Sequence, residues 1–346
     1  MVSPRALWTA GALSALVVGV AVWFGTHRGK HPTERPANGP PGSYVRGTLL
    51  RYLPEQCASY RIYVDLKGVT ETLELRDVLT SERVPGPWKT AFQTFEAAHL
   101  RVGQEIEDLA VCAEQSAEGE DDEATSKTYV AIGGAFGGRE ALSKYKGVIE
   151  GLTRAKDADV VEHESNGVPY LVSSYSTTRK WIAMPAPDVL VFYTDAVAEV
   201  GALAKSHDVD ARAWQLEGGT LASFERRQKD EEATAGETAR SLWGTVSLEG
   251  DRLLLEARSA LDPATSVTPD MLASLQTRLA DTVAGSSFPG LADPVRQMKL
   301  EVGTRSVHVR LEVPVAKIIE AGATASTHRE AVPELFTKIR RISVRR

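Results

Sequence analysis

The stretch from Ala6 to Phe24 (ALWTAGALSALVVGVAVWF) contains no charged residue, and it constrains the architecture more than any other part of the sequence. At ~1.5 Å rise per residue, a helix over this stretch is roughly 28 Å long, close to the roughly 30 Å hydrocarbon core of a bilayer. Trp8 and Trp23 lie near its two ends, where amphipathic aromatic rings favour the membrane interface. The sequence therefore predicts a transmembrane anchor within residues 1–26.

Two other interpretations of this stretch stay open. A cleaved signal peptide needs a shorter apolar stretch followed by small residues two positions apart, and here Trp23, Phe24 and His27 occupy that region. A lipoprotein signal is excluded because the first cysteine is Cys57. A buried core helix is the remaining alternative, although a proline-rich segment is unusual directly after such a helix.

The flanking charges indicate the side of the membrane in two opposite ways. One basic residue, Arg5, precedes the apolar stretch, and three, Arg28, Lys30 and Arg35, follow it. By the positive-inside rule, the part of the chain after the linker, here called the body, would stay in the cytoplasm. The very short N-terminal tail instead resembles a signal anchor, which exports the polypeptide on its C-terminal side. We expect a single-pass inner-membrane protein with a periplasmic body, and a cytoplasm-facing tethered regulator is the alternative.

The remainder of the chain has the composition of a folded, water-soluble protein. Of the 346 residues of the whole chain, 42% are hydrophobic and 25% are charged, which suffices for one large domain or two ordinary ones. The net charge of -6 argues against a nucleic-acid binder, because neutralising phosphates requires clustered Lys and Arg.

The two cysteines, Cys57 and Cys112, exclude a disulfide-dense scaffold and a zinc site built from cysteine pairs. They could form one bridge in an oxidising compartment. Cys57 precedes the first expected strand and Cys112 lies late in the second. If these strands are parallel, the cysteines lie at opposite ends of the sheet, and the bridge is then not expected.

Residues 27–47 are rich in Pro, Gly and charge, which predicts a linker. A first α+β unit is expected over residues 48–228. Its strongest local signal is Asn166-Gly167 between two short apolar segments, because a two-residue hairpin turn favours positive φ at both positions. Further strands are expected at 60–66, 106–113, 128–135, 179–184 and 189–193, with helices near 87–99, 139–152, 196–205 and 211–228.

A second α+β unit is expected over residues 239–346. Strands at 242–248 and 252–257 flank the turn Glu249-Gly250-Asp251, and strands at 297–302 and 306–313 flank a turn at Gly303-Thr304. Between these pairs, helical spacing of apolar residues predicts a helix over 269–284, and the chain is expected to end in helices. The two units share this element order, so we expect largely antiparallel sheets with helices on one face and a diverged duplication.

Four short motifs follow one another within residues 50–313: Leu53-Pro54, the strand end Val64-Asp65, Gly134 to Gly138 (GAFGG) and Asn166 to Tyr170 (NGVPY). This succession resembles a class of uncharacterised bacterial cell-envelope proteins with an N-terminal anchor or lipid attachment. The resemblance implies an envelope location and a duplicated α+β domain, and it carries no established activity. This chain lacks the lipid-bearing cysteine that some of those proteins have.

The glycine-rich stretch Gly133, Gly134, Gly137 and Gly138 lies between an expected strand and an expected helix, where phosphate-binding loops occur. Its spacing fits neither the dinucleotide fingerprint nor the phosphate loop. Glu140 would also compete with a phosphate at the helix start. A structural turn is the favoured interpretation.

Two further patterns, one of a catalytic serine and one of a metal-binding histidine, do not meet the spacing or geometry that such sites require. Ser176, Thr177 and Lys180 approach the Ser-x-x-Lys pattern of acyl-serine enzymes, but the serine spacing is one residue too long and the segment is an expected strand. His163 stands between Glu162 and Glu164, yet in a strand it faces away from both, and the histidines are scattered singly.

Two charge clusters have structural interpretations as well. The acidic run at 118–123 lacks the alternating ligand spacing of a calcium loop, so a solvated loop is favoured. The C-terminal segment carries five basic residues that suit a helix C-terminus or, alternatively, anionic lipid or an acidic envelope partner. These are Lys338, Arg340, Arg341, Arg345 and Arg346.

No catalytic, cofactor-binding or metal-binding set therefore emerges from the sequence. We predict a non-enzymatic, membrane-anchored extracytoplasmic domain that binds or scaffolds other envelope components. The alternative is an envelope hydrolase whose site is assembled from residues distant in sequence.

Overall fold

The structure is a computed structural model, and it describes fifteen separate ranges of the chain. The residues described are 49, 52–53, 60–72, 95–96, 98–113, 128–138, 142–143, 145–148, 160–173, 180–194, 219–229, 238–261, 267–327, 334–335 and 337–339. The expected anchor at residues 6–24 and the expected linker lie outside these ranges. Within them, no helix combines the length and the apolar character needed to span a bilayer.

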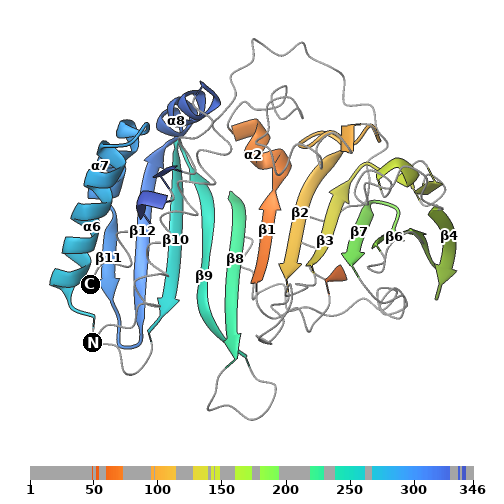
Figure 1. Ribbon diagram of the computed structural model, residues 1–346, viewed down its shortest axis with the longest axis horizontal. Coiled ribbons are helices and arrows are strands. Elements are labelled where there is room, and N and C mark those ends of the chain that lie inside the picture. Colours follow the sequence, from red (N-terminus) through yellow and green to blue (C-terminus); the bar gives the residue numbers. More distant parts are fainter. Residues whose placement is uncertain are drawn as a thin grey trace. The chain divides into compact units, whose positions relative to one another are not determined.

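The described elements form a mixed α/β protein in which the paired strands run antiparallel (Figure 1). Internal contacts divide them into two units. The N-terminal unit holds strands β1 to β7 and helix α2, and the C-terminal unit holds strands β8 to β12 and helices α6, η4, α7 and α8. The largely antiparallel α+β class that the sequence predicts agrees with this architecture.

The N-terminal unit is a meander with one reversal of direction. Its strand order is β1-β2-β3-β7-β6-β5-β4, so the last strand in sequence lies beside the third. Helix α2 (Leu66–Thr72), which the sequence pattern does not predict, directly follows β1. The strands are β1 (Tyr60–Asp65), β2 (Ile106–Ala113), β3 (Thr128–Gly134), β4 (Val160–Ser165), β5 (Val168–Ser173), β6 (Lys180–Ala186) and β7 (Val189–Thr194).

One face of this sheet carries the larger part of the buried core. Cross-strand neighbours form a continuous row across the strands, because side chains directly opposite one another share a face. Two aromatic residues of the same core, Tyr129 at 2% and Trp181 at 1% exposure, lie on this face in β3 and β6, on either side of β7. The row consists of Tyr63, Ala110, Ala131, Val191, Ala183 and Tyr170.

The predicted hairpin at Asn166-Gly167 is present. It joins β4 to β5, with φ of 51° at Asn166 and 77° at Gly167. Both values lie in the left-handed region that a two-residue turn between twisted strands requires. The amide side chain of Asn and the absence of a Cβ in Gly make that region accessible.

Cys112 is disulfide-bonded, contrary to the expectation from a parallel strand pair. That expectation was wrong because β1 and β2 are antiparallel, with Arg61 opposite Cys112. The beginning of β1 and the end of β2 therefore lie at the same end of the sheet. The second cysteine of the sequence, Cys57, lies outside the described residues.

The C-terminal unit has the strand order β11-β12-β10-β9-β8. Its helices α6 and α7 contact β11 and β12, and α8 contacts β12 (Figure 1). The strands are β8 (Thr220–Lys229), β9 (Thr238–Glu249), β10 (Arg252–Ala260), β11 (Lys299–Val302) and β12 (Ser306–Pro314). The helices are α6 (Pro269–Ala284), η4 (Pro289–Leu291), α7 (Ala292–Arg296) and α8 (Val315–Thr327).

Helix α6 has the bounds that the sequence predicts. Its first turn is capped by Thr268, whose Oγ1 accepts a hydrogen bond from the Met271 amide at 3.3 Å. Pro269 occupies the first helical position, where no amide donor is needed. A buried stripe at helical spacing faces the sheet, formed by Leu272, Leu275, Leu279 and Val283.

Strand β8 lies where a helix over 211–228 was expected, so that prediction was wrong for its described part. Ala222, Glu225, Arg226 and Gln228 are residue types that tolerate a helix well. In the structure, however, residues 220–225 are all buried and the strand pairs along its length with β9. Burial on both faces removes the two-residue alternation by which a strand is recognised in sequence.

Candidate functional site

The C-terminal sheet has one buried face and one charged face. Along β12, Val307, Val309, Leu311 and Val313 are each 5% exposed or less, and they alternate with half-buried polar residues. The buried set faces the helices that contact β12. In β10 the residues opposite them, Leu255 and Ala257, are buried as well. On the other face the described side chains of β10 and β12 are largely charged and at least partly exposed, with Leu254 buried among them at 4%.

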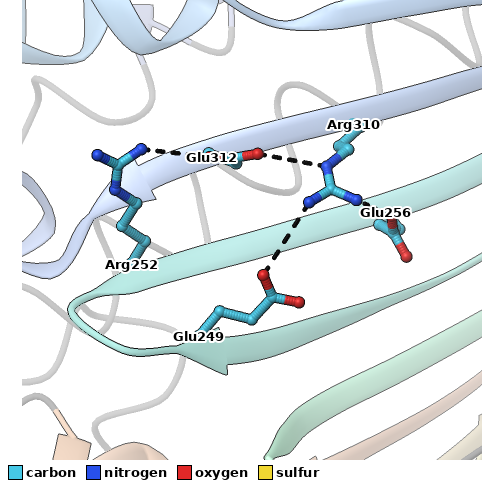
Figure 2. A network of polar contacts seen from close by, with 5 residues as sticks. All are labelled: Glu249, Arg252, Glu256, Arg310 and Glu312. Carbon is cyan, nitrogen blue, oxygen red and sulfur yellow. Dashed lines mark hydrogen bonds and ion pairs between the residues drawn. The ribbon is translucent and has the colours of Figure 1, made fainter.

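Five charged side chains on this second face form one network (Figure 2). Arg310 lies at its centre and donates from Nη1 to Glu256 Oε1 at 2.9 Å and from Nε to Glu312 Oε1 at 3.3 Å. Its Nη2 atom lies 4.0 Å from Glu249 Oε2. Arg252 donates from Nη1 to the second carboxylate oxygen of Glu312 at 3.3 Å.

Strand register explains why these side chains meet. Glu256 and Arg310 are direct cross-strand partners on β10 and β12, and Glu312 follows Arg310 by two residues on the same face. Arg252 and Glu249 are partners across the β9–β10 turn. The network thus spans β9, β10 and β12 and needs the tertiary pairing of β12 with β10.

The charges in the network shift one another's protonation. The hydrogen bond to Glu312 is the largest cause that raises the pKa of Arg310. Desolvation is the next largest and opposes it, and the charges of Glu256, Glu312 and Glu249 add to the rise. The Arg310 hydrogen bond, reinforced by Arg252, holds the pKa of Glu312 below its ordinary value. Both side chains are partly exposed, at 42% for Arg310 and 38% for Glu312, so solvent screens the network and it fixes side-chain positions and charge more than it stabilises the fold.

Further charges on the same face enlarge this surface. Lys299 on β11 is the cross-strand partner of Arg310, and Glu301 is the partner of His308. Arg258 lies opposite His308 on β10. We define the charged sheet face as Glu249, Arg252, Glu256, Arg258, Lys299, Glu301, Arg310 and Glu312, a set with equal numbers of acidic and basic residues.

A Ser–His contact at the end of this face was not identified from the sequence. The Ser306 Oγ and His308 Nε2 atoms lie 3.1 Å apart, within reach for a nucleophile and its base. Among the described residues, no acidic side chain is hydrogen-bonded to His308 in a way that would orient its ring. A two-residue spacing in a strand is the sequence signal that places both side chains on one face.

The glycine-rich stretch has a packing role at Gly134. A Cβ on this residue would lie 1.9 Å from the Glu105 carbonyl oxygen, which is backbone and has no freedom to yield. The next amide, Ala135, donates to the same oxygen at 2.9 Å. Tyr145 Oη donates to the Phe136 carbonyl at 2.7 Å, and burial followed by the Glu105 charge raises the pKa of Tyr145. This loop is therefore held by internal contacts.

The other singled-out residues are not brought together. His163 stacks on Tyr170 at a ring-centroid distance of 5.4 Å, on the opposite side of β4 from Glu162 and Glu164. No group of His, Cys, Asp or Glu suited to a metal occurs in the described part of the chain. Lys180 begins β6, whereas Ser176, Thr177 and the acidic run at 118–123 lie outside the described residues.

The basic C-terminal segment is described only in part. Lys338 Nζ lies 2.7 Å from Glu334 Oε1, which is an ion pair one helical turn apart. Arg340, Arg341, Arg345 and Arg346 lie outside the described residues. Over all the ranges that the structure describes, no catalytic constellation is evident.

Comparisons with known proteins add little to this geometry. No protein-family model and no curated protein match the sequence. Among solved structures, crystal form III of TP0453 aligns with a TM-score of 0.44 at 9% identity, over 80% of this chain and 98% of that one. Crystal form I of TP0453 aligns at 0.41 and 9% identity over 82% and 98%. At these TM-scores the likeness carries no argument about function.

Proposed function

We propose that this chain is a membrane-tethered, extracytoplasmic binding module that contacts another envelope protein through the charged sheet face. The observation that carries the proposal is the asymmetry of the C-terminal sheet. One face is buried beneath helices, and the other carries charges of both signs on four adjacent strands, with ion pairs between side chains of β9, β10 and β12. Such a face complements a partner of mixed charge, because each wrong pairing of like charges is penalised.

The tether rests on residues 6–24, whose length and lack of charge suit a bilayer. Export is supported by the disulfide at Cys112, because disulfides persist in oxidising compartments and are rare in the cytosol. This observation favours the periplasmic orientation over the cytoplasmic one that the flanking positive charges indicate.

A diverged duplication is part of the same proposal. In each unit three sequential strands pair in order, and the last strand returns beside the third, giving β1-β2-β3-β7 and β8-β9-β10-β12. Beyond that last strand, the remaining strands follow in reverse order of sequence, β6-β5-β4 in the N-terminal unit and β11 in the C-terminal unit. The N-terminal unit would differ by one additional hairpin. What supports common descent is this shared path of the strands in the two units.

Two measurements test location and binding separately. Protease added to intact spheroplasts is expected to digest the body from outside, and protection of the body would reject the extracytoplasmic orientation. For binding, a photo-crosslinker at position 258 on the charged sheet face is expected to capture a discrete partner, and the variant Arg310→Glu is expected to abolish capture. A matched crosslinker at Ser274, on the exposed side of α6, serves as the control.

The enzymatic alternative has its own test. The Ser306 and His308 pair would be the nucleophile and base of a hydrolase. If the purified body hydrolyses ester or amide substrates and Ser306→Ala abolishes that turnover, the binding proposal is wrong. We expect no turnover that depends on Ser306.

A further inference from the structure

Strand β4 is the outermost described strand of the N-terminal sheet (Figure 1). Its neighbour β5 is buried at four of six positions. In contrast, four consecutive residues of β4, from Val161 to Glu164, are exposed, and Val161 is 44% exposed. An apolar residue at that level of exposure on an edge strand is a common feature of surfaces that accept a partner.

The outward edge of β4 offers main-chain hydrogen-bonding groups. In a hairpin closed by a two-residue turn, the pair next to the turn, here Ser165 and Val168, exchanges hydrogen bonds, and every second pair does so. The intervening residues Glu164 and Glu162 therefore direct their N–H and C=O groups away from β5. These two residues form the ladder that an added strand would use.

The two faces of β4 specify the side chains of such a strand. On one face the apolar row through Ala183 and Tyr170 ends at His163, and the next row through Trp181 and Val172 ends at Val161. On the other face the strand carries the carboxylates of Glu162 and Glu164. A neighbour on β4 would thus meet apolar and aromatic groups on one side and two negative charges on the other.

We propose that β4 is a docking edge to which an extended polypeptide segment, alternating basic and apolar residues, adds as a further strand. The added segment continues the apolar row over Val161 and pairs its basic side chains with Glu162 and Glu164, which is strand addition with charge selection. Pairing of β4 with the β4 of a second copy is disfavoured, because carboxylates would then lie opposite carboxylates.

Among the described strands β4 lies at the edge of the sheet, and the usual protections of an edge strand are weak in it. It contains no proline and no lysine, its pairing with β5 shows no bulge, and its six residues have the length of an ordinary strand. Its two glutamates are the remaining protection, and they repel acidic or like-charged strands while attracting basic ones. The edge is therefore selective.

A peptide with the sequence of residues 338–346 (KIRRISVRR) is a suitable probe, because its Arg341 to Arg345 portion alternates basic or polar with apolar residues. The labelled peptide is titrated with the full-length protein in detergent. We expect saturable binding, and weaker binding of a peptide of the same composition in which the alternation is scrambled. Absence of binding, or equal binding of the two peptides, would overturn the proposal.

Backbone methylation tests strand addition without altering the protein. Two further peptides carry N-methyl groups on alternate residues, one set on odd and the other on even positions. An added strand has one edge against β4 and one edge in solvent, so one peptide is expected to lose binding and the other to retain it. Loss with both peptides, or with neither, would reject a strand ladder.

Variants of the protein test the side chains and the edge. Glu162→Lys combined with Glu164→Lys is expected to weaken peptide binding roughly tenfold or more. Glu320→Lys, at an exposed acidic residue on helix α8 outside the charged sheet face, is the matched control and should leave binding unchanged. Glu162→Pro removes one outward amide and leaves the bonds to β5 intact, and thermal unfolding verifies that it folds. If Glu162→Pro folds and binds normally, the contact is electrostatic only and the proposal is wrong.

Discussion

At the residue scale, single contacts decide which side chains are structural and which remain available. Gly134 has no room for a Cβ because the Glu105 carbonyl approaches it, whereas Gly147 has open space around it. The Arg310 side chain forms ion pairs with three carboxylates and is still 42% exposed. The spacing of the glycines at 133–138 matches no phosphate-binding motif, so the sequence predicts a structural role for them. It contains no local signal for the Arg310 network, because the members of that network come from three strands.

Replacing Arg310 by Gln is expected to raise the pKa of Glu312 toward its ordinary value, because the Arg310 hydrogen bond is the largest cause of its depression. The rise is partial, since Arg252 also donates to Glu312. Because the pKa of Glu312 is lower in the folded protein than in the unfolded chain, ionised Glu312 stabilises the folded protein at pH values above the ordinary carboxyl pKa. This stabilisation is lost as the pH falls through the pKa that Glu312 has in the folded protein.

Carboxyl carbon NMR across a pH titration measures this change. Arg258→Gln, on the same face of β10, is the control and should leave the Glu312 titration in place. An unchanged Glu312 pKa in Arg310→Gln would show that the network does not persist in solution.

Gly134→Ala is expected to lower the free energy of unfolding by more than about 2 kcal/mol, because a Cβ and the Glu105 carbonyl cannot occupy the same space. Chemical denaturation of the two proteins measures the difference. Gly147→Ala is the matched control, and it should be neutral or slightly stabilising. Equal stability of Gly134→Ala and the parent would contradict the close approach.

At the element scale, local signals account for the parts of the fold that were predicted well. Helix α6 has a capping threonine, a proline at its first position and a buried stripe, and each of these is visible in sequence. The Asn166-Gly167 turn is equally local. In contrast, β8 is decided by pairing with β9, because its helix-tolerant composition gives no strand signal.

Thr268→Ala is expected to destabilise the C-terminal unit by about 1 kcal/mol, because the Met271 amide loses its capping acceptor. Thr277→Ala lies in the middle of the same helix, where the Thr277 hydroxyl donates to the Ala273 carbonyl. That control should be neutral or stabilising, since Ala favours the helix interior. Thermal unfolding that ranks the two variants in the reverse order would contradict the capping geometry.

At the scale of the whole molecule, two units of similar strand path are combined with one disulfide. Cys112 is 0% exposed and belongs to the core of the N-terminal unit together with Tyr63 and Tyr129. The C-terminal unit contains no cysteine in its described strands. The bond therefore constrains one unit and leaves the other unaffected.

Loss of the disulfide through Cys57→Ala combined with Cys112→Ala is expected to destabilise the N-terminal unit by about 2–5 kcal/mol. Hydrogen exchange followed by mass spectrometry distinguishes the units, with faster exchange expected in β2 and β3 and unchanged exchange in α6. Equal acceleration in both units would contradict their separate stability. Expression of the body in a reducing cytoplasm should reproduce the effect of the double variant.

The sequence by itself determined the features that depend on neighbours in the chain: the bounds of α6, the turn at Asn166-Gly167 and most strand positions. The anchor at residues 6–24 stays a prediction. The glycine spacing at 133–138 does not fit a phosphate-binding loop and predicted a structural turn, which agrees with the close packing at Gly134. Only the tertiary structure decided that β1 and β2 are antiparallel, that β8 is a strand, and that Arg310 meets Glu249, Glu256 and Glu312. The physical reason is that strand partners and their direction are chosen by contacts distant in sequence, whereas turns and caps are satisfied within a few residues.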